Sequence, residues 1–428
     1  MNYPEPTGPD PVLSNGSPDE PVLPGLGLPE PVLPGPRLPE PGLAESGPAR
    51  PQYRERSIAF NPGQAFFNPK NQFVRDLGVL AAAVHRETQG SLRILETMAG
   101  SGVRALRYGM EAGAEALWVN EGNPDLGELL TANLKPVVEK LGDRLHLSQE
   151  NAIQILAQAL AQGQTYDLVD IDAFGAGTEY FSLGLQVTAP GGLLYVTATD
   201  GRALGGHDPD RCLQRYGTFG RAHPSHSEQG LRIVIGNLAQ TAAQLGFGVT
   251  PVLATYTGQT YRVMVRRSTK RLPLVHSYGF LGYCHRCGTY QAMPWRKLGQ
   301  PVCGQHSPPQ PLTLTGPLWL GAFHDRSLLP RLITQAKTWE WLDCLKKLEI
   351  MEQEAELPPY HFTLGEIGKR GAIDPPPRDR LLAQLHRAGY AASPLHWNPQ
   401  AIKTTAPIAT CIALSCSGRS GELSDYSE

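Results

Sequence analysis

Between about Tyr53 and Ser268, short apolar runs rich in Val, Ile and Leu alternate with amphipathic stretches of helical period. This alternation predicts a parallel sheet covered by helices. The predicted strands are Leu92–Glu96, Ala116–Asn120, Arg144–Ser148, Asp167–Ile171 and Leu193–Thr197. The predicted helices run approximately over Val103–Glu111, Leu126–Leu141, Ala152–Gln162, Tyr180–Val187 and Glu228–Leu245.

Two further strand-like runs, Val249–Tyr256 and Tyr261–Val265, flank a turn with Gly258 and predict a hairpin. Five βα units closed by an antiparallel hairpin form a doubly wound α/β sheet. A plain dinucleotide-binding domain lacks such a hairpin. The pattern instead resembles the seven-stranded sheet of the methyltransferases that use S-adenosylmethionine.

A smaller α+β region, residues 269–416, is predicted to follow this sheet. It opens with cysteine pairs and continues through an amphipathic helix near Leu328–Glu354. It ends in a unit with a helical stretch at Arg380–Arg387 and a strand-like run at Ile408–Leu414. The helix-then-strand order resembles a winged helix.

Composition separates both ends from this folded part. The first 50 residues hold 14 of the 39 prolines and carry a net charge of −5. Ser417–Glu428 carries −2, so residues 51–416 carry +5. Because proline blocks helix and strand propagation, we predict a disordered Pro-rich tail over 1–52. We predict a second, acidic disordered tail over 417–428, with a methyltransferase-like domain over 53–268 and a second domain over 269–416.

Several classes of protein are excluded by what the chain lacks. No apolar run reaches the roughly 18–20 residues of a membrane-spanning helix. The N-terminus resembles neither a secretory signal nor a transit peptide. Seven thinly spread cysteines argue against a disulfide scaffold and for a reducing, cytoplasmic setting. We expect no membrane association and no obligate protein partner.

A nucleotide pocket is predicted where the first strand meets its helix. The turn Glu96–Gly102 contains Gly100 and Gly102, which allow a sharp bend and close approach of a ligand. Glu121 ends the second strand, where a carboxylate can accept both hydroxyls of a ribose. Asn151-Ala152 follows the third strand and can meet an adenine amino group. A nicotinamide-dependent oxidoreductase is the alternative interpretation.

The fourth strand ends in Asp170-Ile171-Asp172-Ala173-Phe174-Gly175, at the edge where open α/β sheets bind ligands. Asp172 is the candidate to accept a proton or hydrogen bond from a nucleobase, and Phe174 the candidate to stack on it. We expect Asp170 to face the other way and to be structural.

Together these segments identify the chain as similar to the tRNA (guanine-26, N2)-dimethyltransferase family. The similarity spans Phe60 to Ala406. It is carried by Phe67-Asn68-Pro69, Arg75-Asp76-Leu77, Glu96–Arg107, Asp172-x-Phe174-Gly175, Gly191–Leu194, Thr197–Asp200, Tyr216-Gly217, Glu228-x-x-Leu231-Arg232, Tyr261-Arg262-Val263, Gly316–Trp319 and Ile402-Lys403-Thr404.

The resemblance implies a reaction and residue roles. It implies methylation of the exocyclic N2 of guanine 26 in tRNA, with S-adenosylmethionine as methyl donor. The number of methyl groups, and modification of guanine 27, stay open. By motif matching, Arg75 and Arg104 should contact the methionine part, Glu121 the ribose, and Asn151-Ala152 the adenine. Asp172 matches the family's proposed catalytic carboxylate.

Two positions depart from the family pattern. Ala173 replaces the usual proline of Asp-Pro-Phe-Gly, which loosens the backbone that aims Asp172. Asn151 stands where relatives usually have Asp. Its amide oxygen can still accept a hydrogen bond from an amine, so we expect adenine binding to be retained.

A metal site is predicted in the second region. Cys284, Cys287, Cys303 and His306 follow the pattern C-x2-C-x15-C-x2-H, which lies in the range of zinc ribbons. His285 competes with His306 as fourth ligand, and the family resemblance would place a fourth cysteine there. We predict a structural Zn²⁺ held by these residues.

Clustered cations predict an RNA surface shared by both domains, because phosphate contacts need flexible cations. They are Arg262, Arg266, Arg267, Lys270 and Arg271 after the hairpin, and Lys369, Arg370, Arg378, Arg380, Arg387 and Lys403 in the last domain. A non-catalytic, zinc-dependent RNA-binding protein is the third class considered. The glycine turn with Glu121 disfavours it.

Overall fold

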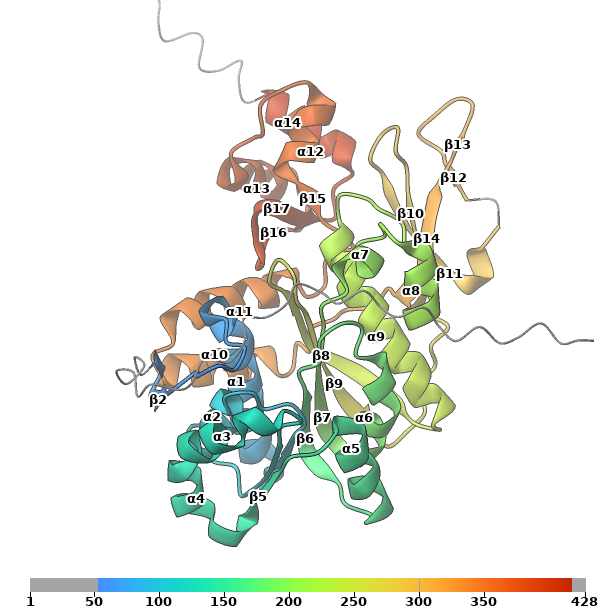
Figure 1. The fold of residues 1–428 in the computed structure, drawn as a ribbon. Helices are drawn as coiled ribbons and strands as arrows, with labels where there is room; N and C mark the ends of the chain where they lie inside the picture. Colours follow the sequence, from blue (N-terminus) through green and yellow to red (C-terminus); the bar gives the residue numbers. More distant parts are fainter. Residues whose placement is uncertain (1–52, 300, 418–428) are drawn as a thin grey trace, which may run out of the picture. The chain divides into compact units, whose positions relative to one another are not determined.

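A computed structural model describes residues 53–299 and 301–417 (Figure 1). All of them fall within one compact unit, Arg50–Glu428. The disordered tails predicted at 1–52 and 417–428 lie outside the described residues, except for Ser417, the last residue of helix α14. Within the described part of the chain, no helix is both long and apolar enough to cross a bilayer.

A seven-stranded sheet in the order β5-β4-β3-β6-β7-β9-β8 forms the centre of the unit. Its strands are β3 (Arg93–Glu96), β4 (Ala116–Asn120), β5 (Leu145–Ser148), β6 (Tyr166–Ile171), β7 (Thr188–Ala198), β8 (Gly248–Tyr256) and β9 (Tyr261–Ser268). β9 is the one strand of this sheet that runs opposite to the rest, antiparallel to β7 and to β8. The chain reverses its direction of strand addition between β3 and β6, which opens a crevice at their carboxyl ends. The predicted sheet and closing hairpin are confirmed.

Helices cover both faces of the sheet (Figure 1). They are α1 (Gln72–Gln89), α2 (Val103–Met110), α3 (Gly127–Asn133), α4 (Lys135–Leu141), α5 (Ala152–Ala161), α6 (Phe181–Val187), α7 (Gly201–Leu204), α8 (Pro209–Tyr216) and α9 (His226–Gln244). Leu95 and Val169 pack in a core with α5, α6 and α9, whereas their neighbours Ile94 and Leu168 pack in a second core with α1, α2 and α4. Successive strand residues therefore alternate between two buried faces.

The helices differ from the prediction in several places, and the short helices α7 and α8 were not predicted. The predicted helix Leu126–Leu141 is two helices, because Pro136 lacks an N–H and starts a new first turn in α4. Leu328–Glu354 is likewise divided into α10 (Leu329–Thr338) and α11 (Leu342–Glu354), with Glu340 left-handed (φ 56°) between them. Helix α1 was not predicted, because it is buried nearly all round and lacks a clear polar face.

Two small antiparallel sheets follow the large one. β10 (Tyr278–Tyr283) pairs with β11 (Tyr290–Pro294) and β14 (Thr313–Trp319). β12 (Val302–Cys303) pairs with β13 (Gln310–Pro311). β14 lies so close to α9 that a Cβ on Gly236 would come within 3.2 Å of the Trp319 nitrogen. The second region is therefore packed directly on a helix of the first.

The last segment has the element order of a winged helix. β15 (Phe362–Thr363) is followed by α12 (Leu364–Gly371), α13 (Arg378–Arg387), the hairpin β16 (Ala392–Leu395) and β17 (Asn398–Thr404), and α14 (Ile408–Ser417). The strand order is β15-β17-β16. The strand predicted at Ile408–Leu414 is wrong: these residues form α14, whose Ile408 and Cys411 are buried in the core. A short apolar run does not distinguish a buried strand from a buried helix turn.

A buried ionic cluster joins this last segment to α9. The Lys403 Nζ lies 2.6 Å from Glu228 Oε1, and Arg232 Nη2 lies 2.8 Å from the same oxygen. All three side chains are at most 2% exposed. Burial opposes ionisation of Glu228, but Lys403 and Arg232 outweigh it and hold the pKa of that carboxyl below its ordinary value. The expectation that Lys403 contacts RNA is therefore wrong, because Lys403 is enclosed by its partners.

We expect Lys403→Met to lower the free energy of unfolding by about 3 kcal/mol, since removing one partner leaves a buried charge unpaired. Equilibrium denaturation in urea measures this change. Lys369→Met is the matched control, because Lys369 is exposed on α12 of the same segment. Equal stability of the two variants would contradict a net contribution from the buried pair.

Candidate active site

A cavity of about 610 Å³ opens at the carboxyl ends of β3, β4 and β6. This volume is typical of a small-molecule site. Its walls are the turn after β3, the residues following β4 and β6, the start of α5, and the segment Gln64–Asn68 before α1. Nearly all the site residues predicted from the sequence line it: Arg75, Glu96, Gly100, Arg104, Glu121, Asn151, Ala152, Asp172 and Phe174.

The two predicted glycines differ in their surroundings. Both have left-handed backbones, with φ of 57° at Gly100 and 77° at Gly102. A Cβ on Gly100 would meet nothing closer than Ala65 at 4.0 Å, so the backbone here is open to a ligand. A Cβ on Gly102 would lie 2.6 Å from Leu130. Gly102 is outside the cavity lining and is required by its backbone and by packing against α3.

Glu121 holds its carboxylate against the glycine turn. One oxygen accepts from the Gly100 N–H at 2.6 Å, and the other accepts from the Asn123 N–H at 2.8 Å. The carboxylate is thereby fixed at the end of β4, beside the cavity. Its remaining lone pairs can accept from the two hydroxyls of a ribose.

Asn151 is the N-cap of α5. Its Oδ1 accepts from the Ile153 N–H at 2.9 Å, and Gln154 accepts from the Asn151 N–H at 3.3 Å. This reciprocal capping box fixes the side chain at the cavity wall. An amide oxygen has two lone pairs, so one is left for a ligand amine.

Glu96 is a buried carboxyl group with an oxygen that lacks a hydrogen-bond partner. Its side chain is 2% exposed, and its Oε2 has no hydrogen-bond partner among the described residues. Burial, reinforced by the neighbouring charge of Asp170, raises the pKa of this carboxyl well above its ordinary value. A cationic ligand group would relieve both the desolvation and the missing bond. The pocket therefore fits a small molecule with an ammonium group.

Asp172 lies at the end of β6 between two arginines. It pairs with Arg104 Nη1, accepts from Arg262 Nη1 at 3.1 Å, and accepts from the Thr197 hydroxyl at 2.5 Å. Burial opposes its ionisation, but Arg104 and Arg262 hold the pKa of Asp172 well below its ordinary range. Asp172 is therefore ionised, with a side chain that is 35% exposed to the cavity.

Asp170 was expected to face away from Asp172, and this is wrong. Residues two apart on a strand share a face. Asp170 accepts from Arg262 Nη2 at 3.0 Å and from the Tyr108 hydroxyl at 2.7 Å. It is fully buried, so its role is structural, as expected.

Arg262 also departs from its predicted role as an RNA contact. It is fully buried, and its guanidinium lies 3.7 Å from the centre of the Tyr195 ring. Arg266 and Arg267 donate to the backbone carbonyls of Gly191 and Thr188. The partly buried Arg370 donates to the carbonyls of His285 and Arg286. These cations hold the fold together.

An aromatic pair lies at the cavity wall. Phe66 and Phe174 are each 71% exposed, and their ring centres are 5.4 Å apart in an edge-to-face arrangement. Sequence reasoning selected Phe174 but missed Phe66. The available signal was the Phe66-Phe67 pair next to Asn68-Pro69, a turn sequence that favours exposure of one ring.

The predicted metal ligands come together in the second region. One ligand atom each from Cys284, Cys287, Cys303 and His306 lie within 4.8 Å of one another. The Cys284 Sγ is 3.4 Å from His306 Nε2, and the Cys287 and Cys303 sulfurs are 3.6 Å apart. His285 instead contacts the Tyr283 ring. Three thiols and one imidazole are a donor set that fits tetrahedral Zn²⁺.

Known proteins match this sequence and fold. The chain is 28% identical over 354 residues to the tRNA (guanine(26)-N(2))-dimethyltransferase of Thermococcus kodakarensis, covering 80% of this chain and 90% of that protein. It is 30% identical over 365 residues to the protein of the same name from Methanospirillum hungatei, covering 82% and 92%.

A solved structure, Trm1 from Pyrococcus horikoshii in complex with S-adenosyl-L-methionine, shares the fold with a TM-score of 0.73 and 23% identity. The match covers 85% of this chain and 99% of that one. The family model for N2,N2-dimethylguanosine tRNA methyltransferases matches residues 47–414. Since this match spans both regions described above, the chain belongs to the N2,N2-dimethylguanosine tRNA methyltransferase family.

Proposed function

We propose that this protein transfers methyl groups from S-adenosylmethionine to the exocyclic N2 of guanine 26 in tRNA. The names of the relatives support this reaction. The observation that carries it is one cavity lined both by Asp172, which is held between Arg104 and Arg262, and by the buried Glu96, whose Oε2 has no partner among the described residues. One group can accept from a nucleophile, and the other can hold a cationic donor.

The residues that would hold the donor surround the β3 turn. Glu96 would accept from its ammonium group, and Arg75 and Arg104 would pair with its carboxylate. Glu121 would bind the ribose hydroxyls, and Asn151 with Ala152 would bind the adenine. S-adenosylmethionine supplies a methyl carbon bound to a positively charged sulfur, ready for transfer to a nucleophile.

Asp172 would prepare that nucleophile. The lone pair of the guanine amine is delocalised into the ring, so the amine reacts poorly on its own. A carboxylate that accepts a hydrogen bond from this amine returns electron density to it and receives its proton as the new N–C bond forms. Arg104, Arg262 and Thr197 fix Asp172, so the amine is aligned without further reorganisation.

Phe66 and Phe174 would hold the base outside the RNA stack. A guanine buried in a stem must leave it before its amine can enter the cavity, which costs a few kcal/mol. Two exposed rings at the cavity wall offer a face and an edge for the extruded base. Large apolar side chains this exposed often mark an interaction site. Among the described residues, each of these rings contacts no aromatic ring other than its pair.

The proposed reaction is tested with radiolabelled S-adenosylmethionine, unmodified tRNA and mapping of the modified nucleoside. We expect label at a guanine N2, and the map distinguishes one methyl group from two and position 26 from 27. Absence of label at a guanine amine would refute the proposal.

We expect Asp172→Asn to lower kcat by about 100-fold or more, because the amide cannot take the proton. Calorimetric binding of S-adenosylmethionine should stay near that of the parent protein. Asp143→Asn, an exposed residue before β5, is the control for loss of a charge and should leave kcat unchanged. Near-normal turnover of Asp172→Asn would remove this residue from the catalytic step.

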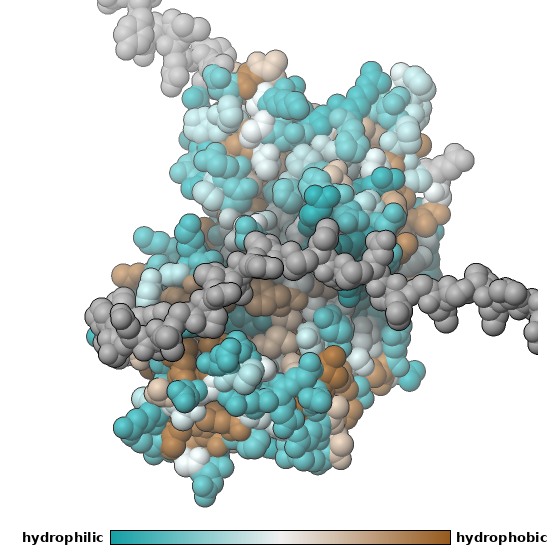
Figure 2. Space-filling view, viewed as in Figure 1, coloured by the Kyte–Doolittle hydropathy of each residue, from teal (hydrophilic) through white to brown (hydrophobic). Residues whose placement is uncertain are grey.

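We further propose that residues 53–268 bind the donor and 269–416 recognise tRNA. From Phe362 to Ser417, five basic residues besides the buried Lys403 face three acidic ones, a net charge of +2. In the element order of a winged helix, α13 takes the place of the second helix of the α12–α13 pair, which is the one that contacts nucleic acid. The visible surface over α12–α14, at the top of Figure 2, is mostly hydrophilic.

Helix α13 has an exposed cation for this role. Arg387 is exposed in its last turn, whereas Leu381 and Leu385 of the same helix are buried. The turn between β16 and β17, which would be the wing, is occupied: His396 Nε2 lies 3.0 Å from the Thr255 hydroxyl of β8. The helix is therefore more available to tRNA than the wing.

Replacing Arg387 by Ala should weaken tRNA binding and reduce the slope of log K against log salt by about 1, because one phosphate contact is lost. Filter binding at several salt concentrations measures the slope. Arg144→Ala, exposed directly before the edge strand β5, is the control with equal loss of charge. An unchanged slope in the α13 variant would contradict this surface.

We propose that Cys284, Cys287, Cys303 and His306 hold a structural Zn²⁺. One zinc per chain is expected by elemental analysis, and Cys303→Ser should lose it together with thermal stability, because metal binding contributes to folding. His285→Asn is the matched control and should retain the metal. Purified protein without zinc would contradict the site.

A further inference from the structure

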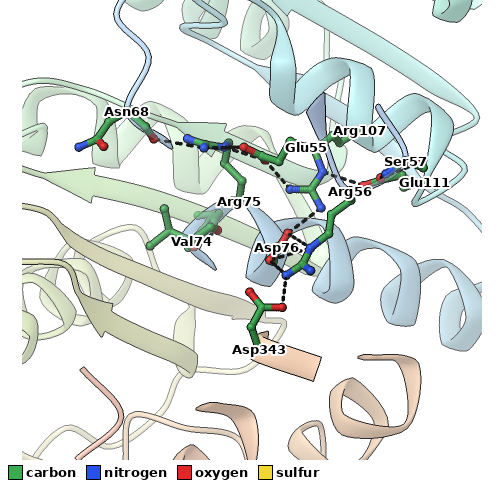
Figure 3. A network of polar contacts seen from close by, with 11 residues as sticks. Glu55, Arg56, Ser57, Asn68, Val74, Arg75, Asp76, Arg107, Glu111 and Asp343 are labelled. Carbon is green, nitrogen blue, oxygen red and sulfur yellow. Dashed lines mark hydrogen bonds and ion pairs between the residues drawn. The ribbon is translucent and has the colours of Figure 1, made fainter. Parts of the chain in front are cut away.

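A continuous chain of opposite charges runs from the cavity into the C-terminal half of the protein (Figure 3). Its members alternate in sign: Arg75, Glu55, Arg107, Asp76, Arg56 and Asp343. Arg75 and Asp76 come from α1, Arg107 from α2 and Asp343 from α11. Glu55 and Arg56 belong to the hairpin β1 (Tyr53–Glu55) and β2 (Ile58–Phe60) or its turn.

Glu55 is the member of this series of ion pairs that contacts Arg75, which lines the cavity. Its Oε1 accepts from Arg75 Nε at 2.9 Å and its Oε2 accepts from Arg75 Nη2 at 2.6 Å. The two side chains are 3% and 5% exposed, so water does not weaken the pair. This two-point contact fixes the plane of the guanidinium as well as its position.

The remaining surroundings of Arg75 restrict it further. Its Nη2 also donates to the Asn68 carbonyl at 3.2 Å, and its guanidinium lies 4.9 Å from the centre of the Phe67 ring. Since Nε and Nη2 are committed to Glu55, only Nη1 is left for a ligand in the cavity that Arg75 lines. An arginine without this anchor would lose side-chain entropy on binding and could adopt several rotamers.

We propose that Glu55 is a positioning residue of the methyl-donor pocket, which holds Arg75 with Nη1 directed to the carboxylate of the donor. This inference rests on the proposed function and adds a residue that does not itself line the cavity. Glu55 acts through Arg75, so its loss should affect donor affinity far more than tRNA affinity.

The chain offers a matched control in Glu111. Glu55 and Glu111 each accept from Arg107 at 2.7 Å, and each belongs to the same buried network. Glu111 also accepts from Ser57 of the hairpin turn. Of these two carboxylates, Glu55 contacts Arg75 and Glu111 does not, among the described contacts. A purely structural role for the network predicts the same effect for both substitutions, whereas a positioning role predicts a difference.

The test is calorimetric titration of full-length Glu55→Gln and Glu111→Gln with S-adenosylmethionine in the absence of tRNA. We expect about tenfold weaker binding for Glu55→Gln, equal to the loss of about 1.4 kcal/mol, and a change under twofold for Glu111→Gln. The midpoint temperature of thermal unfolding should fall by similar amounts in the two variants. Glu55→Asp, which keeps the charge, should recover part of the affinity and serves as a second variant if Glu55→Gln does not fold.

Two results would overturn the inference: parent-like donor binding by Glu55→Gln, or equal weakening in the Glu55 and Glu111 variants. A rise in the tRNA dissociation constant larger than that for the donor would also oppose it. Failure of the proposed function has a different signature, because the parent protein itself would then neither bind S-adenosylmethionine nor label tRNA.

Discussion

Buried arginines pair with the two carboxylates at the end of β6 and hold Asp172 at the cavity wall. Arg262 comes from β9, crosses β7 and reaches both Asp170 and Asp172. Arg104 reaches Asp172 from α2. Two like charges on one strand face would repel and would be costly to bury without these partners. The antiparallel hairpin therefore closes the sheet and also supplies the cation that allows Asp172 to stay ionised.

The same principle holds the C-terminal half in place. Helix α11 begins next to Asp343, which pairs with Arg56, and ends at Glu354. Glu354 accepts from both His324 and His396, all of them fully buried at the turn of the winged-helix hairpin. Burial opposes ionisation of Glu354, but His396 and His324 lower its pKa to about 2. One helix therefore connects the network around the donor pocket to the segment proposed to contact tRNA.

The sheet and most of the site could be predicted from the sequence because both follow from local rules. A buried parallel strand requires an apolar run, and the carboxyl ends of parallel strands meet at one edge, so Glu96, Glu121 and Asp172 had to come together. What escaped prediction depends on distant partners. Lys403 pairs with a residue 175 positions away, and Glu55 contacts Arg107 across 52 positions. The sequence alone does not distinguish a cation that faces water from one that pairs with a buried carboxylate.

The pKa values of Glu96 and Asp172 are shifted in opposite directions, so these two carboxyl groups of one cavity suit different roles. Burial next to Asp170 raises the pKa of Glu96, so this group gains most from a cationic ligand. Arg104 and Arg262 lower the pKa of Asp172, which makes it a weak base. A weak base is sufficient here, because an aromatic amine becomes strongly acidic once its nitrogen bonds to a fourth carbon or hydrogen. Asp172 would therefore orient the amine and receive its proton, which leaves readily as the new N–C bond forms.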